Sequence, residues 1–405
     1  MEADRRPRGV RFWAAAAVAA FALAGCATQP PVNTAGHALG LTPVEYSALP
    51  GWGVDRADAA LATFVGGCAA MNSQQSLGGA GLAASLGGSA QNWTAACNVA
   101  RTLPAGDANA ARAFFERAFQ PYAVADTASD GPGLFTGYYE PELSGSRAAT
   151  SGFPTPLLRA PPELVTVDLT PFDEDLRGRH ITGRIEGGTF VPYYDRAAID
   201  AGALARRRLE LLWVSDPVDA FVLQIQGSGR VRLPDGSVVR VSYDRQNGRP
   251  YVPIGRVLAQ RGDIPLGQVT MPAIRAWLAA HPEQAASLME TDPSYVFFRE
   301  LGGVRPDQGP PGALGAPLVP GRSIAVDKRF LPLGAPVFLD TTDPLDGSAL
   351  RRLMVAEDLG GAIRGPVRAD VFWGWDADAA TRAGTMKAPG RAWLLLPRPA
   401  VVAAN

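Results

Sequence analysis

The sequence predicts a mainly β protein with helices, divided into more than one domain. From about Gly137 onward, short apolar segments alternate with Gly and Pro residues, a pattern typical of a small barrel or sandwich. Two other segments repeat their apolar residues at helical spacing. About 380 residues remain once an export signal is set aside, which is more than a single hydrophobic core usually organises.

The first 25 residues have the features of a bacterial export signal. Arginines precede an apolar run, Phe12–Ala24, and small residues precede Cys26. The run of roughly 13 residues is shorter than the ~20 residues that a membrane-spanning helix needs. We therefore expect residues 1–25 to be a signal peptide that is removed.

Cys26 ends the sequence Leu-Ala-Gly-Cys, which resembles the lipobox of bacterial lipoproteins. The resemblance implies that Cys26 is lipidated. Because Ala27 rather than Asp follows it, the expected destination is the periplasmic face of the outer membrane of a Gram-negative bacterium. The alternative is an ordinary secretory signal with an incidental cysteine. Residues 26–45 are rich in Thr, Pro, Gly and Ala without periodicity, which predicts a flexible tether.

Two cysteines remain in the mature chain, Cys68 and Cys97. An oxidising periplasm would allow them to form a disulfide, which for a loop of this size contributes about 3 to 4 kcal/mol. Two buried free thiols are the alternative.

Two helices are expected from their caps and apolar stripes. Asp107 precedes a segment with Phe114, Phe115 and Phe119 at helical spacing, and Thr270 precedes a second segment of this kind. The second stripe consists of Ile274, Trp277 and Leu278. Such stripes are typical of helix faces that pack against a core.

The strand signals include one hairpin and a series of short strands. Apolar residues alternate on both sides of Asp235-Gly236 within Arg230–Tyr243, and this dipeptide favours a type I′ turn. The last third of the chain predicts the strands Ser323–Val326, Val337–Asp340, Leu353–Ala356, Ala369–Trp373 and Trp393–Leu396.

Charge and motifs argue against several classes of function. The formal charge of −1 offers no basic excess for nucleic acid. His37, His180 and His281 lie in unrelated settings, and neither His-x-x-Glu-His nor Cys-x-x-Cys occurs, so no metal site is expected. The segment around Ser228 comes near to Gly-x-Ser-x-Gly but precedes a hairpin, so it predicts no nucleophile elbow. No phosphate-binding loop or dinucleotide fingerprint is present, and no cofactor is expected.

Acidic residues are the remaining candidates for catalysis, and they are densest between Glu357 and Asp370. Asp370 follows Ala369 and precedes Val371, Phe372 and Trp373. A carboxyl group pressed against such an apolar wall has a raised pKa, as a general acid at neutral pH requires. The alternative, from the residues alone, is an Asp that caps a turn at a strand end.

Seven blocks of the sequence have recognisable motifs: Phe135–Pro141, Gln224–Gly229, Tyr251–Gly255, Asp292–Phe298, Gly321–Asp327, Leu331–Gly334 and Asp358–Gly374. The last three together resemble the 3D domain, which is named for three aspartates that we match to Asp327, Asp358 and Asp370. With the four preceding blocks, in this order, they resemble the membrane-bound lytic murein transglycosylase A family. The resemblance covers roughly residues 133–397.

The resemblance implies a double-psi β-barrel catalytic domain with N-terminal helices, formed by residues 46–139 and 250–400. It also implies a smaller inserted β-barrel domain, residues 140–249, with a groove for glycan between the two domains.

The resemblance implies that Asp370 is the catalytic acid and base. We hypothesise that Asp358 holds a barrel loop or the neighbouring sugar, and that Asp327 orients Asp370 or contacts substrate. Turn capping is the alternative for both supporting residues. The candidate substrate-binding residues are Thr136, Tyr138, Tyr139, Gln224, Gln226 and Ser228, for which purely structural roles are the alternative.

The family implies a metal-independent peptidoglycan lytic exotransglycosylase. It would cut the β-1,4 bond between N-acetylmuramic acid and N-acetylglucosamine and leave a 1,6-anhydromuramyl end without using water. Expected partners are glycan strands and the outer membrane, with cell-wall synthases or scaffold proteins as candidate protein partners. The alternatives are a non-catalytic peptidoglycan-binding lipoprotein and a hydrolytic muramidase on the same scaffold.

Overall fold

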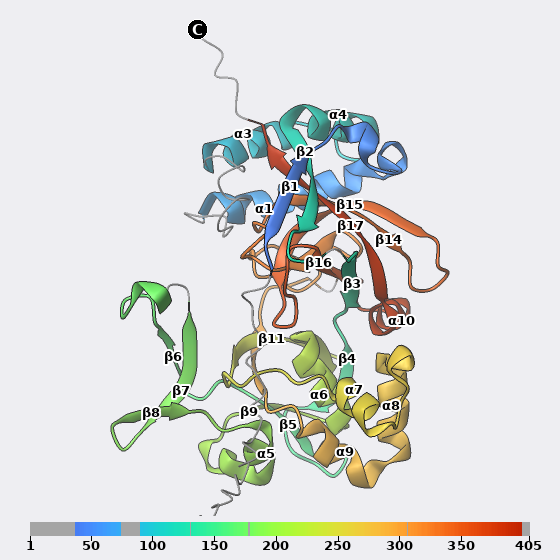
Figure 1. Cartoon of the computed structure of the whole chain (residues 1–405). Helices are drawn as coiled ribbons and strands as arrows, with labels where there is room; N and C mark the ends of the chain where they lie inside the picture. The colour runs from blue at the N-terminus through green and yellow to red at the C-terminus, as the bar shows by residue number, and fades with distance from the viewer. Residues whose placement is uncertain (1–36, 74–89, 130, 177–178, 306, 399–405) are drawn as a thin grey trace, which may run out of the picture. The chain divides into compact units, whose positions relative to one another are not determined.

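The computed structural model describes residues 37–405 except 74–89, 130, 177–178, 306 and 399–405. The predicted signal peptide, Cys26 and most of the tether lie outside the described residues. In the described part of the chain, no helix is long and apolar enough to cross a membrane. The described strands form sheets of eight, six and three strands (Figure 1).

The eight-stranded sheet contains a closed barrel. Its strand order is β1-β2-β17-β14-β15-β13-β16-β3, and an additional pairing of β17 with β3 closes six of these strands into a ring. All five strands predicted from the last third of the sequence lie in this ring, which confirms the mainly β class. The ring comprises β3 (Gly133–Tyr138), β13 (Ser323–Val326), β14 (Pro336–Thr342), β15 (Ala349–Leu359), β16 (Arg368–Phe372) and β17 (Lys387–Pro397).

Strand β1 (Leu39–Pro43) extends the barrel sheet through an antiparallel pairing with β2 (Phe119–Asp126). This segment lies within residues 26–45, which are predicted from the sequence to be a flexible tether. Leu39 and Leu41 nevertheless pack against the barrel core, because alternate residues of a strand face the same side. We therefore propose that the tether ends before Leu39.

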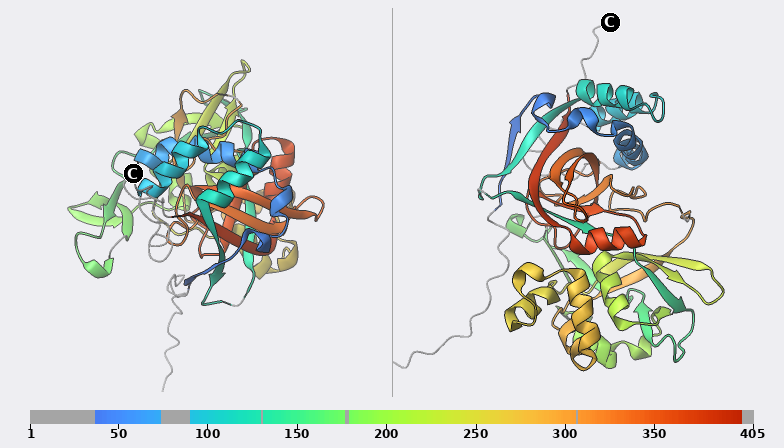
Figure 2. Two further views of the ribbon diagram at one scale, coloured as in Figure 1. Left: turned by 90° about the horizontal axis from the view of Figure 1, so that it is seen from above. Right: turned by 90° about the vertical axis from the view of Figure 1, so that its right-hand side faces the viewer.

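Three helices supply the other half of the barrel core: α1 (Ala57–Ser73), α3 (Ala90–Ala100) and α4 (Ala108–Ala118). Asp107 caps α4 by accepting from the backbone N–H groups of the two residues that follow Ala108. This confirms the helix predicted there. A disulfide joins Cys68 of α1 to Cys97 of α3, with their Cα atoms 5.8 Å apart. Figure 2 shows these helices against the barrel strands.

The six-stranded sheet has the order β12-β11-β10-β4-β9-β5. Its edge strands β5 and β12 contact each other without an assigned strand pairing. The sheet is therefore curved, but no strand pairing among the described residues joins its two edges. Its strands are β4 (Glu142–Ser146), β5 (Thr155–Leu158), β9 (Glu210–Val214), β10 (Ser228–Arg232), β11 (Val238–Gln246) and β12 (Val296–Leu301).

The predicted hairpin is confirmed as β10 and β11, but its predicted type I′ turn is wrong. Gly236 has a φ of 85°, whereas Asp235 is not among the described residues with positive φ. The Gly236 N–H donates to Leu233, and the Leu233 N–H donates to Ser237, which closes a three-residue loop. Pro234 explains the difference, because its ring fixes a negative φ at the first central position of the turn.

Four helices share one core beside this sheet, as Phe221, Leu258, Trp277 and Leu288 show. They are α6 (Pro217–Gln226), α7 (Ile254–Arg261), α8 (Met271–Ala280) and α9 (Pro282–Met289). Helix α8 is the second predicted helix, and Thr270 caps it.

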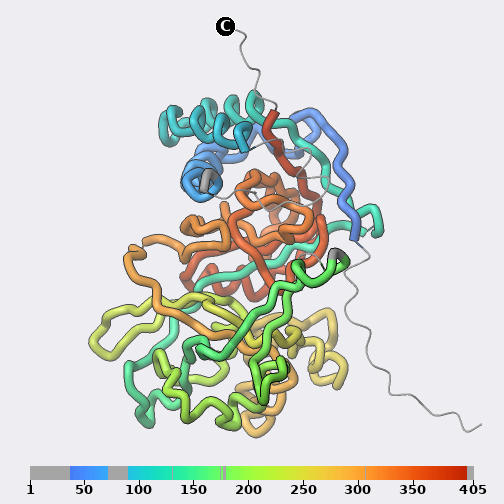
Figure 3. The backbone as a smooth tube through the Cα atoms, turned by 90° about the vertical axis from the view of Figure 1, so that its left-hand side faces the viewer, coloured from blue at the N-terminus to red at the C-terminus, as the bar shows by residue number. Residues whose placement is uncertain are grey.

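Strand β12 follows these helices and pairs with β11. The expected boundary at residue 249 therefore does not coincide with an end of the sheet, and we propose that the inserted domain extends from about Glu140 to Leu301. The chain enters it after β3 and returns to the barrel after β12 (Figure 3).

The remaining elements are smaller. The three-stranded sheet consists of β6 (Val165–Asp168), β7 (His180–Glu186) and β8 (Thr189–Pro192), and two more helices are α5 (Arg196–Ala198) and α10 (Ala377–Thr385). Short helical turns occupy Tyr46–Ala48, Trp52–Val54, Glu174–Leu176, Ile199–Ala203, Ala205–Arg207 and Leu266–Gln268.

Candidate active site

Asp370 lies on β16, between Ala325 of β13 and Thr136 of β3 in the barrel register. The residue is partly exposed, and its Oδ1 accepts a hydrogen bond of 2.5 Å from the Thr136 hydroxyl. Burial raises the pKa of Asp370 above its usual range, against the charge of Arg368 and the bond from Thr136, which lower it. The net shift is upward, as a general acid near neutral pH requires.

Asp358 lies near the end of β15 and faces the same site. Its two oxygens accept from the Tyr138 hydroxyl at 2.8 Å and from the Ala313 N–H at 2.9 Å. Burial raises the pKa of Asp358, and these hydrogen bonds oppose the rise. The negative charge of Asp358 in turn raises the pKa of Asp370. The two carboxyl groups are therefore electrostatically coupled.

Asp327, the third matched aspartate, has a different environment. Its buried carboxylate pairs with Arg329 at 2.5 Å and accepts from the Gly365 N–H at 3.0 Å. Burial acts to raise the pKa of Asp327, but the hydrogen bonds from Arg329 and Gly365 outweigh it, so the pKa is lowered. These contacts tie the turn after β13 to the loop before β16, as expected of the turn-capping alternative.

Three candidate substrate-binding residues lie on β3 or directly after it: Thr136, Tyr138 and Tyr139. The hydroxyl of Thr136 is directed at Asp370 and that of Tyr138 at Asp358. The Tyr138 ring is buried, with its centroid 5.3 Å from that of Phe372. Thr136 and Tyr138 therefore hold the two carboxyl groups. The Tyr139 ring is partly exposed, and its backbone N–H donates to Gln226 at 3.0 Å.

The candidates on α6 and β10 also differ in whether they contact the residues around Asp370. Gln226, at the end of α6, accepts from Tyr139 and so lies beside the β3 segment. Gln224 is buried and accepts from Arg196 at 2.7 Å. Ser228 is buried at the start of β10, opposite Ser242 of β11. Of these three, the structure connects Gln226 to the site residues through a hydrogen bond.

Comparisons with known proteins agree with this geometry. Residues 134–299 match the model of the MltA specific insert domain, and residues 322–396 match that of the 3D domain. The solved structure of a membrane-bound lytic murein transglycosylase from Agrobacterium tumefaciens is 33% identical and has a TM-score of 0.77. The match covers 89% of this chain and 98% of that one. The chain belongs to the membrane-bound lytic murein transglycosylase A family.

Other members of the transglycosylase A family are similar to this chain. The Neisseria gonorrhoeae MltA structure is 35% identical, with a TM-score of 0.72, over 89% of this chain and 95% of that chain. The Escherichia coli K12 membrane-bound lytic murein transglycosylase A is 34% identical over 274 residues. That alignment spans 65% of this chain and 66% of the E. coli protein, slightly less than two thirds of its length.

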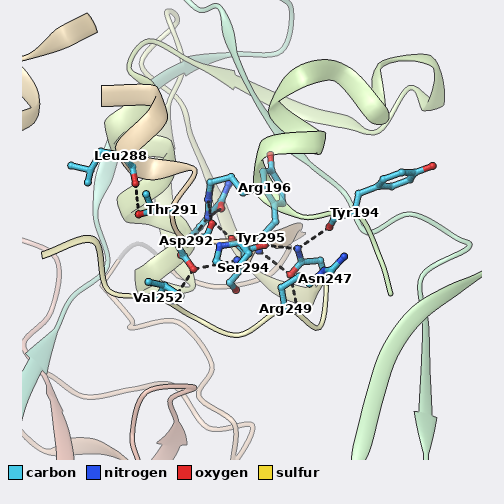
Figure 4. Close-up of polar contacts among 12 residues, drawn as sticks. Tyr194, Arg196, Asn247, Arg249, Val252, Leu288, Thr291, Asp292, Ser294 and Tyr295 are labelled. Atoms are coloured by element: carbon cyan, nitrogen blue, oxygen red, sulfur yellow. Dashed lines mark hydrogen bonds and ion pairs between the residues drawn. The ribbon is translucent and has the colours of Figure 1, made fainter. Parts of the chain in front are cut away.

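One family block, Asp292–Phe298, forms a buried polar network rather than part of the carboxyl site (Figure 4). The Arg196 guanidinium donates to the backbone carbonyls of Asp292 and Ser294, and Asn247 bonds the backbone of Pro293 and Tyr295. The network fixes the segment that leads into β12. It also explains the position of Gln224, whose side-chain carbonyl accepts from the same guanidinium.

Sequence reasoning missed two buried carboxyl groups of this transglycosylase A chain. Burial raises the pKa of Glu357 to about 8, although the Ser323 hydroxyl donates to it at 2.5 Å. Glu140 is fully buried and pairs with both Arg230 and Arg240. Position in the sequence was the one signal for these residues. Glu357 directly precedes Asp358, and Glu140 lies near the end of the block Phe135–Pro141. Neither position indicates that the side chain is buried.

Proposed function

We propose that the protein is a lytic transglycosylase that cuts the β-1,4 bond between N-acetylmuramic acid and N-acetylglucosamine in peptidoglycan. The observation that carries this proposal is the environment of Asp370 at the family motif. Asp370 is partly exposed as a residue. Its carboxyl group is held by Thr136, and its pKa is raised by burial and by the charge of Asp358. It is an acid that remains protonated closer to neutral pH than an ordinary aspartate.

A single carboxyl group is sufficient for the proposed reaction. Protonated Asp370 donates its proton to the glycosidic oxygen as the bond to C1 of the muramyl ring breaks. The resulting carboxylate accepts the proton of the C6 hydroxyl of the same ring, whose oxygen bonds to C1 and forms the 1,6-anhydro end. Because the nucleophile belongs to the substrate, the attack avoids the entropic cost of capturing a separate molecule. Glycosidases that use water instead employ two carboxyl groups.

Asp358 and Tyr138 support the acid in this proposal. The Tyr138 hydroxyl and the Ala313 N–H give Asp358 two hydrogen bonds that favour its carboxylate form. A carboxylate there opposes ionisation of Asp370 and so keeps the acid protonated. Asp358 is thus assigned an electrostatic role.

Tyr139 and Gln226 are the proposed contacts for the glycan. The first offers a partly exposed ring, and the second an amide joined to the Tyr139 backbone. Aromatic faces and amide groups suit pyranose rings and their acetamides. An E. coli MltA structure with bound chitohexaose is similar to this chain, with 29% identity and a TM-score of 0.59. The match covers 76% of this chain and 83% of that one. A chain of N-acetylated sugars is therefore the proposed ligand class.

The proposed location is the periplasmic face of the outer membrane, through a lipid on Cys26. This rests on the Leu-Ala-Gly-Cys sequence and on the membrane-bound family name. Metabolic labelling with a radioactive or clickable fatty acid tests it, since Cys26→Ser should abolish incorporation. Label retained by Cys26→Ser would place the lipid elsewhere.

Digestion of purified peptidoglycan, followed by mass spectrometry of the released ends, tests the activity. Anhydromuramyl ends support the proposal. Reducing muramic acid ends would indicate a hydrolase, and glycan binding without release would indicate a binding protein.

A further inference from the structure

A chain of hydrogen bonds approaches Asp370 from Arg368. The Arg368 Nη2 donates to the Thr136 hydroxyl oxygen at 2.9 Å, and that hydroxyl donates to Oδ1 of Asp370 at 2.5 Å. A threonine hydroxyl has a single hydrogen, whereas a guanidinium can only donate. Since Arg368 supplies one of the hydrogens at the Thr136 oxygen, the hydroxyl uses its own hydrogen toward Asp370. The direction of the chain is therefore fixed by Arg368.

This direction determines which oxygen of the acid carries the proton. Oδ1 of Asp370 is occupied as an acceptor, so the proton of the neutral carboxyl group resides on Oδ2. If Arg368 were absent, the Thr136 hydroxyl could rotate and accept from a protonated Oδ1. The proton would then lie between Asp370 and Thr136 instead of on Oδ2.

Local strand geometry places the three side chains together. Arg368 and Asp370 are two residues apart on β16 and so lie on the same face of the strand. Thr136 is the β3 residue in register with Asp370. The guanidinium of Arg368 is itself held by the backbone carbonyls of Leu134, at 3.2 Å, and Ala369, at 2.7 Å. Its position is thus built into the β3–β16 pairing.

We propose that Arg368 is a positioning residue that acts through Thr136 to keep the transferable proton of Asp370 on Oδ2, the oxygen that does not accept from Thr136. The proposal rests on the proposed transglycosylase function. Neither Arg368 nor Thr136 needs to contact the glycan for this role, so the effect should appear in kcat rather than in KM.

The charged and titratable groups around Asp370 give a second, separable signature. Arg368 on the same strand lowers the pKa of Asp370, and Asp358 on β15 raises it. Tyr138 lies further along β3, and Lys387 of β17 is paired with Thr136 from the other side of β3. Losing the charge of Arg368 should move the alkaline limb of the pH profile to higher pH. A variant that loses the hydrogen-bond geometry of Arg368 but keeps its positive charge should leave the alkaline limb in place.

The test compares variants of the full chain, purified in detergent, on isolated peptidoglycan. Arg368→Met removes charge and donors, Arg368→Lys keeps the charge, and Thr136→Val removes the hydroxyl. Thr136→Ser restores it, and Arg391→Met serves as a control because it alters a largely exposed arginine paired with Asp340. The rate of anhydromuramyl end formation is measured against pH and substrate concentration, and each rate is normalised to the folded fraction from thermal melting.

We expect Thr136→Val and both Arg368 variants to lose about 10- to 100-fold in kcat, within the range that misplacing a general acid costs. Thr136→Ser should recover most of the loss of Thr136→Val. Arg368→Met should shift the alkaline limb upward, and Thr136→Val should shift it in the same direction because the hydrogen bond that it loses lowers the pKa of Asp370. Arg368→Lys keeps the charge and should leave the limb in place. Combining Arg368→Met with Thr136→Val should cost little more in kcat than either change alone, because both break one chain.

Several results would overturn the proposal. These are a wild-type kcat for Thr136→Val or Arg368→Lys, additive losses in the double variant, or an alkaline limb that stays in place in Arg368→Met. A wild-type protein that forms no anhydromuramyl ends would instead refute the proposed function, on which this inference depends. The control variant Arg391→Met should match the wild type throughout.

Discussion

The buried carboxylate of Glu140 offers the sharpest test of how the chain is held together after β3. Glu140 has no exposed surface, and its two oxygens accept from the guanidinium groups of Arg230 and Arg240 at 2.6 to 3.0 Å. Arg240 also donates to the backbone carbonyl of Gln308, and the Arg230 guanidinium lies 4.3 Å from the centroid of the Trp375 ring. One buried carboxylate therefore contacts two buried cations.

Glu140→Gln should be strongly destabilising. The amide keeps the shape of the carboxyl group but removes the negative charge that both guanidinium groups contact. Breaking a buried ion pair from one side costs about 3 to 5 kcal/mol. For a domain of this size, each kcal/mol lowers the melting temperature by roughly 2 to 4 °C. A fall of about 6 to 20 °C is therefore expected.

Glu142→Gln is the matched control, because Glu142 lies two residues further along and also pairs with an arginine, Arg232, at 2.8 Å. That pair is largely exposed, with side chains 50% and 41% accessible, so solvent screens it. Circular dichroism melting and urea unfolding of the wild type and both variants provide the measurement. Equal stability losses in the two variants would refute the reasoning, because they would show that burial does not decide the cost.

Three further predictions follow from the same structure. Tyr138→Phe removes the hydroxyl that donates to Asp358, so the pKa of Asp358 should rise further. The rate of end formation per folded molecule should fall about tenfold, beside a stability loss of about 1 to 3 kcal/mol for the lost hydrogen bond; a wild-type rate would contradict the assigned electrostatic role. Replacing Cys68 and Cys97 together with Ser should lower the free energy of unfolding by about 3 to 4 kcal/mol, and a urea midpoint equal to that of the wild type would show that the disulfide adds nothing. Because the pKa of Asp327 is lowered in the folded state, its contribution to stability is present above its unfolded value of about 3.9 and is lost as pH falls through its folded value. The unfolding free energies of the wild type and Asp327→Asn should therefore converge in acid, and a difference that is constant with pH would contradict this.

The sequence was sufficient to predict the elements that depend on local pattern. Asp107 and Thr270 cap helices as expected, since a cap needs only the residues that follow it. The short strands of the last third were also recognisable. The turn at Asp235-Gly236 shows the limit of such patterns, because Pro234 changed the turn type.

Contacts that depend on three-dimensional register could not be predicted. The motif around Asp370 indicated a catalytic acid, but the pairing with Thr136 arises because β3 and β16 lie side by side, more than two hundred residues apart. Gln224 and Gln226 look equivalent in the sequence, yet one is directed to Arg196 and the other to Tyr139. Similarly, the match of three aspartates gave no indication that Asp327 is neutralised by its neighbouring arginine.

The acid role of Asp370 is the central claim, and the direct measurement is the chemistry of the ends released by the wild type and by Asp370→Asn. Asparagine preserves the shape of the side chain and its ability to accept from Thr136, but it cannot donate the proton. The account predicts 1,6-anhydromuramyl ends from the wild type and none from a folded Asp370→Asn variant. Reducing ends from the wild type, or anhydromuramyl ends from Asp370→Asn at a comparable rate, would contradict it.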